Sequence, residues 1–422
     1  MKTKKVIGMA SIVYFDNILK LKEYATKHDI SNIIVKLDHL TYKDLVNNID
    51  IFKKIQYLDS GSKIREIPKE LVNLQYLRCR ITSITKIPKE FTKLHYLDCL
   101  MTQITRIPKE LINLQYLNCS RTFIKKVPKE LINLRTLYCY GLKITRIPKE
   151  LINLQYLDCS WTQVTGGELK EFINLQYLKC TQTQVTEIPK ELSNLQKLYC
   201  NNTKITKIPK ELINLQELSC DLTIINYIPK ELINLQQLYC ERTKIKYISK
   251  ELVNLQYLNC AKSKITIIPK ELVNLRTLIC SRLKIKMLPK ELINLQYLDC
   301  SWTQITEIPK EFSNLQKLYC NNTKITEIPI SFANLQLLDC SNTQVTKIPI
   351  SFANLKILVC LNTLVTEIPS NLDNLKRIYC NVINLYDHET NVLRYKNEIK
   401  DIIKSSDDLN KDVLNIICSY IL

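Results

Sequence analysis

Hydrophobic positions recur along most of this chain with a fixed period, and they occur in one repeated phrase. The phrase reads L-x-x-L-x-C-x-x-T-x-[IV], and T-x-I-P-K-E-[LF]-x-N-L follows it before the next copy begins. Sixteen cysteines between Cys79 and Cys380 mark the copies, and fourteen of the fifteen intervals between them equal the step from Cys79 to Cys99. A fixed period of this length is typical of a solenoid, in which each repeat packs only against its neighbours.

The spacing inside the phrase predicts one short strand in every repeat. In L-x-x-L-x-C the second leucine and the cysteine are two residues apart, so both side chains point inward from the same face of a strand. The T-x-[IV] that follows turns the chain, and I-P-K-E-L-x-N-L returns it across the back of the repeat. A repeat this short leaves too few residues for a full helix on the way back. We therefore expect extended chain or a short 3₁₀ turn that begins at proline.

The N-terminal residues 1–52 lack the repeat and predict a cap. Their pattern indicates an amphipathic helix over Phe15–Tyr24, with Asp16 as its N-cap, and a strand over Ile33–Leu40. The end of a solenoid exposes an unpaired strand and an open core, so an atypical unit that covers both is expected there.

The regular part, residues 53–385, resembles the leucine-rich repeat L-x-x-L-x-L-x-x-N-x-L, with cysteine for the third leucine and threonine for the asparagine. The returning phrase is similar to the short plant, bacterial and Shoc2-like variants of that family. The resemblance implies an α/β-type repeat: a leucine-rich repeat solenoid of about 17 repeats, with a concave parallel β-sheet and a short 3₁₀ or extended convex side. The block-duplicated, lysine-, isoleucine- and asparagine-rich repeats are also similar in style to those multiplied in giant-virus and protist genomes.

The family's asparagine bonds loop backbone groups that would otherwise be buried and unpaired, and a threonine hydroxyl can do part of that work. Leu142, Leu283 and Ile383 replace the threonine and offer no hydrogen bond. The turn geometry at these three positions is therefore left open.

One irregular segment interrupts the regular pattern. Thr165–Phe172 replaces the I-P-K-E phrase and adds one residue, which explains the single longer interval, from Cys159 to Cys180. The insertion fits a bulge, a flexible point or a neutral change around Gly166-Gly167.

Two longer phrases each occur twice in the chain. L-R-T-L-x-C stands at Leu134–Cys139 and again at Leu275–Cys280, and L-D-C-S-W-T-Q stands at Leu157–Gln163 and again at Leu298–Gln304. Both pairs of copies are separated by the same distance along the chain, which spans seven repeats. This spacing indicates the duplication of a block of seven repeats.

The C-terminal residues 386–422 predict a second helical cap. Helical spacing over Thr390–Ser405 is followed by Ser406-Asp407-Asp408, which can cap a last helix. That last helix, Leu409–Ile421, also resembles the first helix of an F-box, without its proline. The resemblance implies an alternative function as an adaptor that recruits a ubiquitin ligase.

The formal net charge of +19 lies in the repeats, and it suggests an anionic partner. Many of the repeat lysines sit in P-K-E, where the following glutamate cancels the charge of each, and the remaining basic residues include Lys86, Arg106, Lys126 and Arg146. Basic rows can attract nucleic acid or an anionic surface, which we keep as a second alternative. Because no nucleic-acid-binding motif accompanies the charge, a solvated surface of mixed sign is favoured over a nucleic-acid partner.

The cysteines predict packing and no metal or disulfide chemistry. Sixteen of the 17 fall at one inward position, where a free thiol packs as a small hydrophobic side chain. No C-x-x-C or Cys/His pairing suggests a metal site, and we expect neither a metal nor a cofactor. Free thiols in this number favour a reducing compartment, the cytoplasm. No apolar run approaches transmembrane length, so no membrane partner is expected.

The strand positions that flank the inward leucine vary, and many of them are tyrosine. A continuous patch for a protein partner is predicted on consecutive strands, formed by Tyr116, Tyr138, Tyr140, Tyr156, Trp161, Tyr177 and Tyr199. A second, weaker patch is formed by Tyr257, Tyr297, Trp302 and Tyr319. Tyrosine and tryptophan combine a large contact area with a polar group and are favoured at binding hot spots. Stacked tyrosines that only stiffen the sheet are the competing interpretation.

No set of residues predicts catalysis. The histidines form no constellation, and no nucleophile motif or phosphate-binding glycine loop is present. The sequence is therefore interpreted as a non-enzymatic intracellular scaffold for protein binding. A monomer is favoured.

Overall fold

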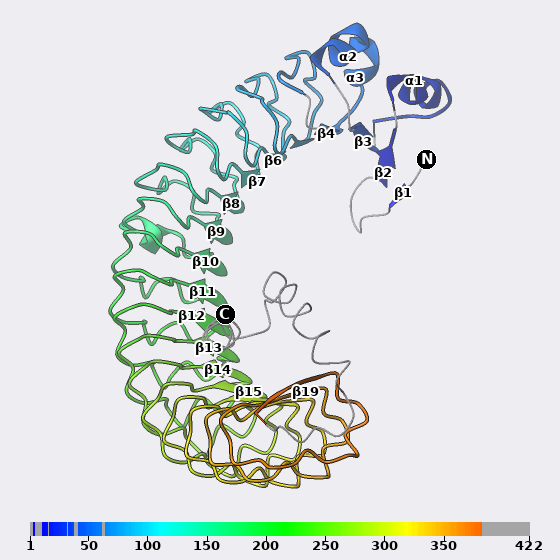
Figure 1. The fold of residues 1–422 in the computed structure, drawn as a ribbon. Coiled ribbons are helices and arrows are strands. Elements are labelled where there is room, and N and C mark those ends of the chain that lie inside the picture. The colour runs from blue at the N-terminus through cyan, green and yellow to red at the C-terminus, as the bar shows by residue number, and fades with distance from the viewer. Residues whose placement is uncertain are drawn as a thin grey trace.

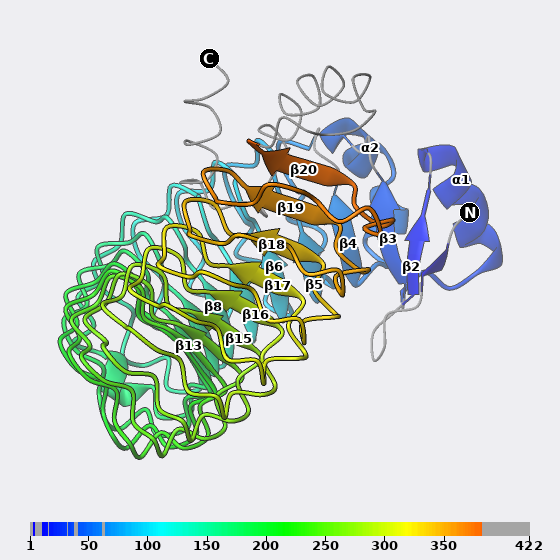
Figure 2. The same ribbon diagram turned by 60° about the horizontal axis from the view of Figure 1, so that its bottom comes forward.

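The computed structural model describes residues 3–4, 11–15, 17–31, 33–37, 41–60 and 64–381. The chain forms a curved parallel β-solenoid with one strand in each turn (Figure 1). The strands line the inner side of the arc and the connecting loops form its outer side. Figure 2 shows that successive turns also shift along the axis, so the arc is a superhelix and no flat ring.

Six short elements precede the regular repeats. They are β1 (Thr3–Lys4), β2 (Ser11–Tyr14), α1 (Ile18–Lys27), β3 (Ile33–Leu37), α2 (Tyr42–Asn47) and α3 (Ile49–Phe52). Helix α1 begins after Asn17, whose side chain accepts a hydrogen bond from the backbone of Lys20. The N-cap is thus Asn17 and the expected Asp16 was wrong by one position. The predicted C-terminal helices, the F-box-like segment and Ile383 lie outside the described residues.

Seventeen strands and one 3₁₀ helix follow. They are β4 (Tyr57–Ser60), β5 (Tyr76–Arg78), β6 (Tyr96–Asp98), β7 (Tyr116–Asn118), β8 (Thr136–Tyr138), β9 (Tyr156–Asp158), η1 (Leu169–Glu171), β10 (Tyr177–Lys179), β11 (Lys197–Tyr199), β12 (Glu217–Ser219), β13 (Gln237–Tyr239), β14 (Tyr257–Asn259), β15 (Thr277–Ile279), β16 (Tyr297–Asp299), β17 (Lys317–Tyr319), β18 (Leu337–Asp339), β19 (Ile357–Cys360) and β20 (Arg377–Cys380).

Each strand pairs with the next one in the sequence. Strands β1 and β2 are antiparallel, and every later pair is parallel and in register, so that Leu218 lies opposite Leu198 and Leu238. The inward leucines, isoleucines and cysteines of neighbouring turns form one continuous core, in which most side chains have no exposed surface. This is the packing that a fixed period imposes, because equivalent side chains of adjacent turns always meet.

The threonine of the phrase closes the turn after each strand. In twelve repeats its hydroxyl donates to the carbonyl of the cysteine three residues earlier, at 2.5–2.9 Å. Where Leu142 replaces threonine, its own backbone N–H donates to the Cys139 carbonyl at 3.3 Å. The turn therefore keeps its shape without the hydroxyl, which answers the question left open for that position.

The irregular segment after Thr165 folds as a compact turn. Gly166 adopts a φ of +88°, which favours glycine, and η1 begins three residues later. Leu169 and Phe172 from this turn are buried in the core. The extra residue is thus absorbed by a tighter helical turn, so the segment keeps the register of the solenoid.

The second residue after each cysteine from Cys79 to Cys360 occupies the left-handed region. Fourteen non-glycine residues have φ between 52° and 59° there, and Gly141 has the same role with a φ of +71°. Asparagine tolerates this conformation, as at Asn202, whereas a leucine such as Leu222 is strained in it. The repeat geometry imposes this corner whatever the residue, so unfavourable side chains remain in several copies.

Substituting Leu222→Asn is expected to stabilise the protein by about 0.5–1 kcal/mol, because asparagine relieves the strain. Leu222 is 49% exposed, so little burial is lost. Urea unfolding followed by circular dichroism measures the change. Ile224→Asn, two residues later and 46% exposed, is the matched control and should give no gain. An equal gain in both variants would contradict the strain argument.

Candidate functional site

A row of stacked tyrosines runs along the N-terminal half of the concave face. Eight rings contact one another in sequence, with centroids 3.9–6.3 Å apart: Tyr57, Tyr76, Tyr96, Tyr116, Tyr138, Tyr156, Tyr177 and Tyr199. They come from consecutive strands, and the closest pair, Tyr156 and Tyr177, is nearly parallel. Each of these tyrosines is half-buried, because its neighbours cover much of both ring faces. The exposed remainder forms one continuous ridge, which we call the tyrosine ridge.

The structure divides the first predicted patch into two parts. Tyr116, Tyr138, Tyr156, Tyr177 and Tyr199 lie in the tyrosine ridge, as their spacing predicted.

Two other members of that patch were wrongly placed on the strands. Tyr140 follows β8, and its hydroxyl accepts a hydrogen bond from Arg121 at 2.8 Å. Trp161 stands at the left-handed corner after β9 and is 55% exposed. Because the strands are only three residues long, the chain has already turned at both positions.

The second predicted patch consists of separate contacts. Tyr257 packs on Tyr239, and Tyr297 packs on Tyr319, which is almost fully buried. Trp302 stands at a left-handed corner beneath the guanidinium of Arg282, 4.7 Å from the ring centroid.

Tyr57, Tyr76, Tyr96 and Tyr239 were not predicted as site residues. They occupy the strand positions that carry tyrosine in other copies, so the repeat phrase itself contained the signal.

Several polar residues beneath the rings are buried and serve the turns. Asp98 has no exposed surface and is paired with Arg80, and burial raises the pKa of its carboxyl while Arg80 opposes that shift. Asp158 and Asp299 accept the backbone N–H of the serine two residues later, each at 3.0 Å. These positions flank the inward leucine on the strand, like those of the tyrosines. The carboxylates already accept hydrogen bonds from Arg80 or from the backbone after the strand. They therefore add little to the surface on which a partner could bind.

Charged residues lie between the tyrosine ridge and the later aromatic pairs and beside the first of those pairs. Lys197 pairs with Glu217 at 2.9 Å, and Lys262 pairs with Glu241 at 3.3 Å. Burial raises the pKa of Asp221 to about 6, although the backbone N–H of Glu241 donates to its carboxylate and opposes that shift. The middle of the concave face is therefore polar, with both signs of charge.

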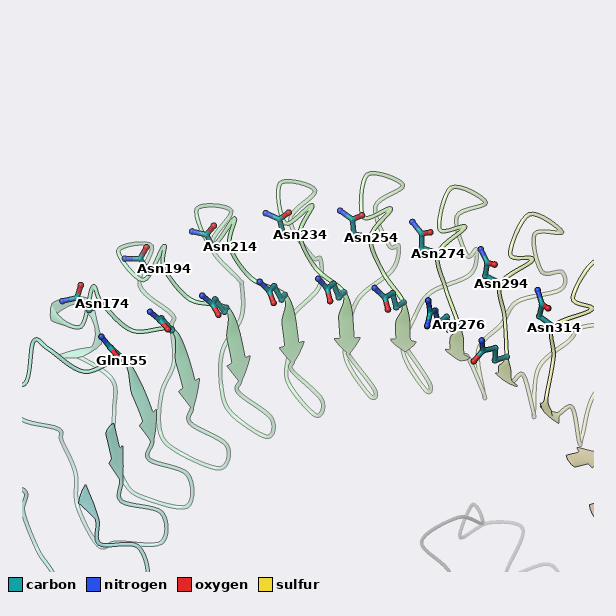
Figure 3. Close-up of a pocket in the computed structure, with 16 residues that line it drawn as sticks. Gln155, Asn174, Asn194, Asn214, Asn234, Asn254, Asn274, Arg276, Asn294 and Asn314 are labelled. Carbon is teal, nitrogen blue, oxygen red and sulfur yellow. The ribbon is translucent and has the colours of Figure 1, made fainter. Parts of the chain in front are cut away.

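A groove lined by amides follows the edge where the strands begin (Figure 3). Its volume is about 1200 Å³, and two rows line it: the asparagines of x-N-L and the residue that precedes each strand, usually glutamine. In fifteen repeats the asparagine Nδ2 donates to a backbone carbonyl of the preceding repeat at 2.8–3.2 Å. This ladder fastens neighbouring repeats together, a role that the sequence pattern did not reveal.

The cysteines form a buried ladder of their own. Of the sixteen cysteines that the structure describes, fifteen are buried and Cys380 is partly exposed, and all sixteen are free thiols. Burial raises the pKa of every buried thiol, and at Cys360 the contact with Cys380 is a still larger cause. In the described ranges no group of three or more His, Cys, Asp or Glu side chains is placed to hold a metal ion. None of the helices described is long and apolar enough to cross a membrane.

Comparison with known proteins supports the repeat class. Models of the leucine-rich repeat match residues 294–315 and, as a two-copy unit, 313–352. No curated protein sequence matches the chain. The parallel solenoid and these matches make the chain similar to leucine-rich repeat proteins.

Similar solved structures include a leucine-rich repeat protein of Leptospira interrogans, with 25% identity, a TM-score of 0.68, and coverage of 84% of this chain and 95% of the other. The functional domain of InlJ from Listeria monocytogenes, which includes a cysteine ladder, shares 26% identity, with a TM-score of 0.68 and 73% of each chain covered. YopM of Yersinia enterocolitica, at 19% identity and a TM-score of 0.64, covers 83% of this chain and 78% of its own, and shows the fold alone.

Proposed function

We propose that this protein is a non-enzymatic scaffold that binds a protein partner on its concave face, with the tyrosine ridge as the main contact. The observation that carries the proposal is the ridge itself: eight tyrosines in unbroken contact along one side of a rigid sheet. A rigid row of aromatic edges loses little conformational entropy on binding, and its hydroxyls remain available for hydrogen bonds.

The inner side of the arc also suits a partner by its shape and its variation. The buried leucines and cysteines hardly change between repeats, whereas residues 76, 96, 136, 197 and 217 at one concave position are tyrosine, threonine, lysine or glutamate. A constant core fixes the scaffold, and a variable concave surface can specialise for one ligand. A reducing intracellular compartment belongs to the same proposal, because the thiols are free.

The double variant Tyr156→Ala/Tyr177→Ala is expected to lower recovery of the partner at least about tenfold, since aromatic hot spots often contribute about 2 kcal/mol or more. The measurement is affinity purification with quantitative mass spectrometry, comparing the variant with the unaltered protein. Ile152→Ala/Ile173→Ala is the matched control, because these residues belong to the same two repeats and are 52% and 53% exposed away from the ridge. Equal loss in both variants, or no loss in either, would overturn the use of the ridge.

A ubiquitin-ligase adaptor is the alternative proposal, and it rests on the F-box-like residues Leu409–Ile421. Removing residues 406–422 separates the two proposals. Ligase components that disappear from the purified complex on truncation support the adaptor, and an unchanged set of partners supports the plain scaffold.

A further inference from the structure

One exposed position changes its chemistry completely between the two copies of the duplicated block. This is the residue directly before the buried aliphatic residue of I-P, which we call the outer position. In four consecutive repeats of the first copy it is Lys86, Arg106, Lys126 and Arg146. In the four equivalent repeats of the second copy it is Tyr227, Tyr247, Ile267 and Met287. The neighbouring lysine and glutamate of P-K-E are the same in both sets, so the change is confined to few positions.

These outer positions lie side by side on the convex side of the arc. In the early block the four basic residues line one groove of about 1080 Å³, together with the I-P-K-E residues of their repeats. In the later block Tyr227, Tyr247, Ile267 and Met287 occupy the equivalent position of four consecutive repeats, so they form a row in the same register. They are 39%, 59%, 74% and 74% exposed, respectively. We call these four residues the apolar row.

Lysines border the apolar row on both sides. Three residues before Tyr247, Ile267 and Met287 stand Lys244, Lys264 and Lys284, and directly before Tyr247 and Met287 stand Lys246 and Lys286. Three residues after each member of the row there is a further lysine, namely Lys230, Lys250, Lys270 or Lys290. All nine are exposed, and none of them makes an ion pair with another described residue. A glutamate follows each of Lys230, Lys250, Lys270 and Lys290. The nine lysines and these four glutamates together carry five net positive charges.

The shape of this surface favours a flat partner over a groove-filling one. The loops that carry the apolar row lie on the outer edge of the arc, and a plane touches a convex arc over only a few repeats (Figure 1). Four exposed apolar side chains within a lysine border combine the two attractions of a peripheral membrane contact, burial of apolar surface and attraction to anionic lipid. Tyrosine in particular is favoured at the level of the lipid headgroups.

We propose that the apolar row and its lysines form a contact site for an anionic phospholipid surface, separate from the concave face. The site needs no spanning helix, so it revises only the expectation of no membrane partner, which rested on the lack of a long apolar run. The two surfaces face opposite sides of the arc, and a protein bound to a membrane in this way would still present the tyrosine ridge to a partner.

The test is sedimentation of the full-length protein with vesicles of phosphatidylcholine alone or with about 30% phosphatidylserine. The unaltered protein is expected to bind the anionic vesicles, and Ile267→Gln/Met287→Gln to bind them at least about tenfold less. Lys126→Gln/Arg146→Gln alters the equivalent positions of the early block and is expected to change binding less than about twofold. Circular dichroism of each variant establishes that the solenoid is folded.

Three results would overturn the proposal. The first is no binding of the unaltered protein to the anionic vesicles, which would leave the apolar row as a protein-docking surface. The second is unchanged binding of Ile267→Gln/Met287→Gln. The third is a larger loss in Lys126→Gln/Arg146→Gln than in Ile267→Gln/Met287→Gln, which would indicate attraction by charge spread over the repeats, as expected for a polyanion such as nucleic acid.

Discussion

Raising the pH from about 9 to about 10 is expected to unfold the solenoid, since the buried thiols resist ionisation only while the protein is folded. Burial raises the pKa of Cys119 and Cys260 from the ordinary 9.0 to about 12. Unfolding returns each thiol to its ordinary pKa, so the unfolded chain releases protons that the folded chain retains. Stability is thus fully present below about pH 9 and falls as the pH rises toward the folded-state pKa values.

The magnitude follows from the number of thiols. Above the pKa of the unfolded chain, ionisation of one thiol lowers the free energy of unfolding by about 1.4 kcal/mol for each pH unit. Fifteen buried thiols together cost about 20 kcal/mol per unit if the chain unfolds as a whole, which exceeds the typical stability of a domain.

Circular dichroism during an alkaline titration measures the midpoint. A chain in which Cys200, Cys220, Cys240 and Cys260 are replaced by alanine should show a shallower pH dependence, in proportion to the thiols removed. A midpoint above about pH 11 for the unaltered protein would contradict the argument.

Phe172→Ala is expected to destabilise the protein by about 3–5 kcal/mol, the cost of deleting a large buried aromatic side chain and leaving a cavity. Phe172 has no exposed surface and ends the 3₁₀ turn that absorbs the extra residue of the irregular repeat. Gly166 is already packed 3.1 Å from the side chain of Val185, measured from the position a Cβ would take, so the turn has little room to collapse into the cavity.

Urea unfolding gives the stability of this variant, and Ile173→Ala is its control. Ile173 is adjacent and 53% exposed, so its truncation should cost less than about 0.5 kcal/mol. A small loss for Phe172→Ala, similar to that of the control, would show that the irregular turn is a flexible point, as one of the sequence interpretations held.

The repeat phrase predicted the solenoid because its period leaves few alternatives. Residues two apart on a strand share a face, and a constant period brings equivalent residues together in every turn. For the same reason the stacking of Tyr156 on Tyr177 followed from position alone. The phrase misplaced Trp161, because the strand ends after three residues and the chain turns through a left-handed corner that no local pattern marks.

The sequence by itself determined the period, the inward leucines and cysteines, and the side of the strand on which the tyrosines lie, since these depend only on residue spacing. Only the tertiary structure decided which polar residues remain free. Asp98 accepts a hydrogen bond from Arg80 and Asn113 donates one to the carbonyl of Thr92, because hydrogen bonds between repeats depend on how the turns stack. The exposure of Met287 was likewise settled by the curvature of the outer side, which spreads the loops and leaves that side chain uncovered.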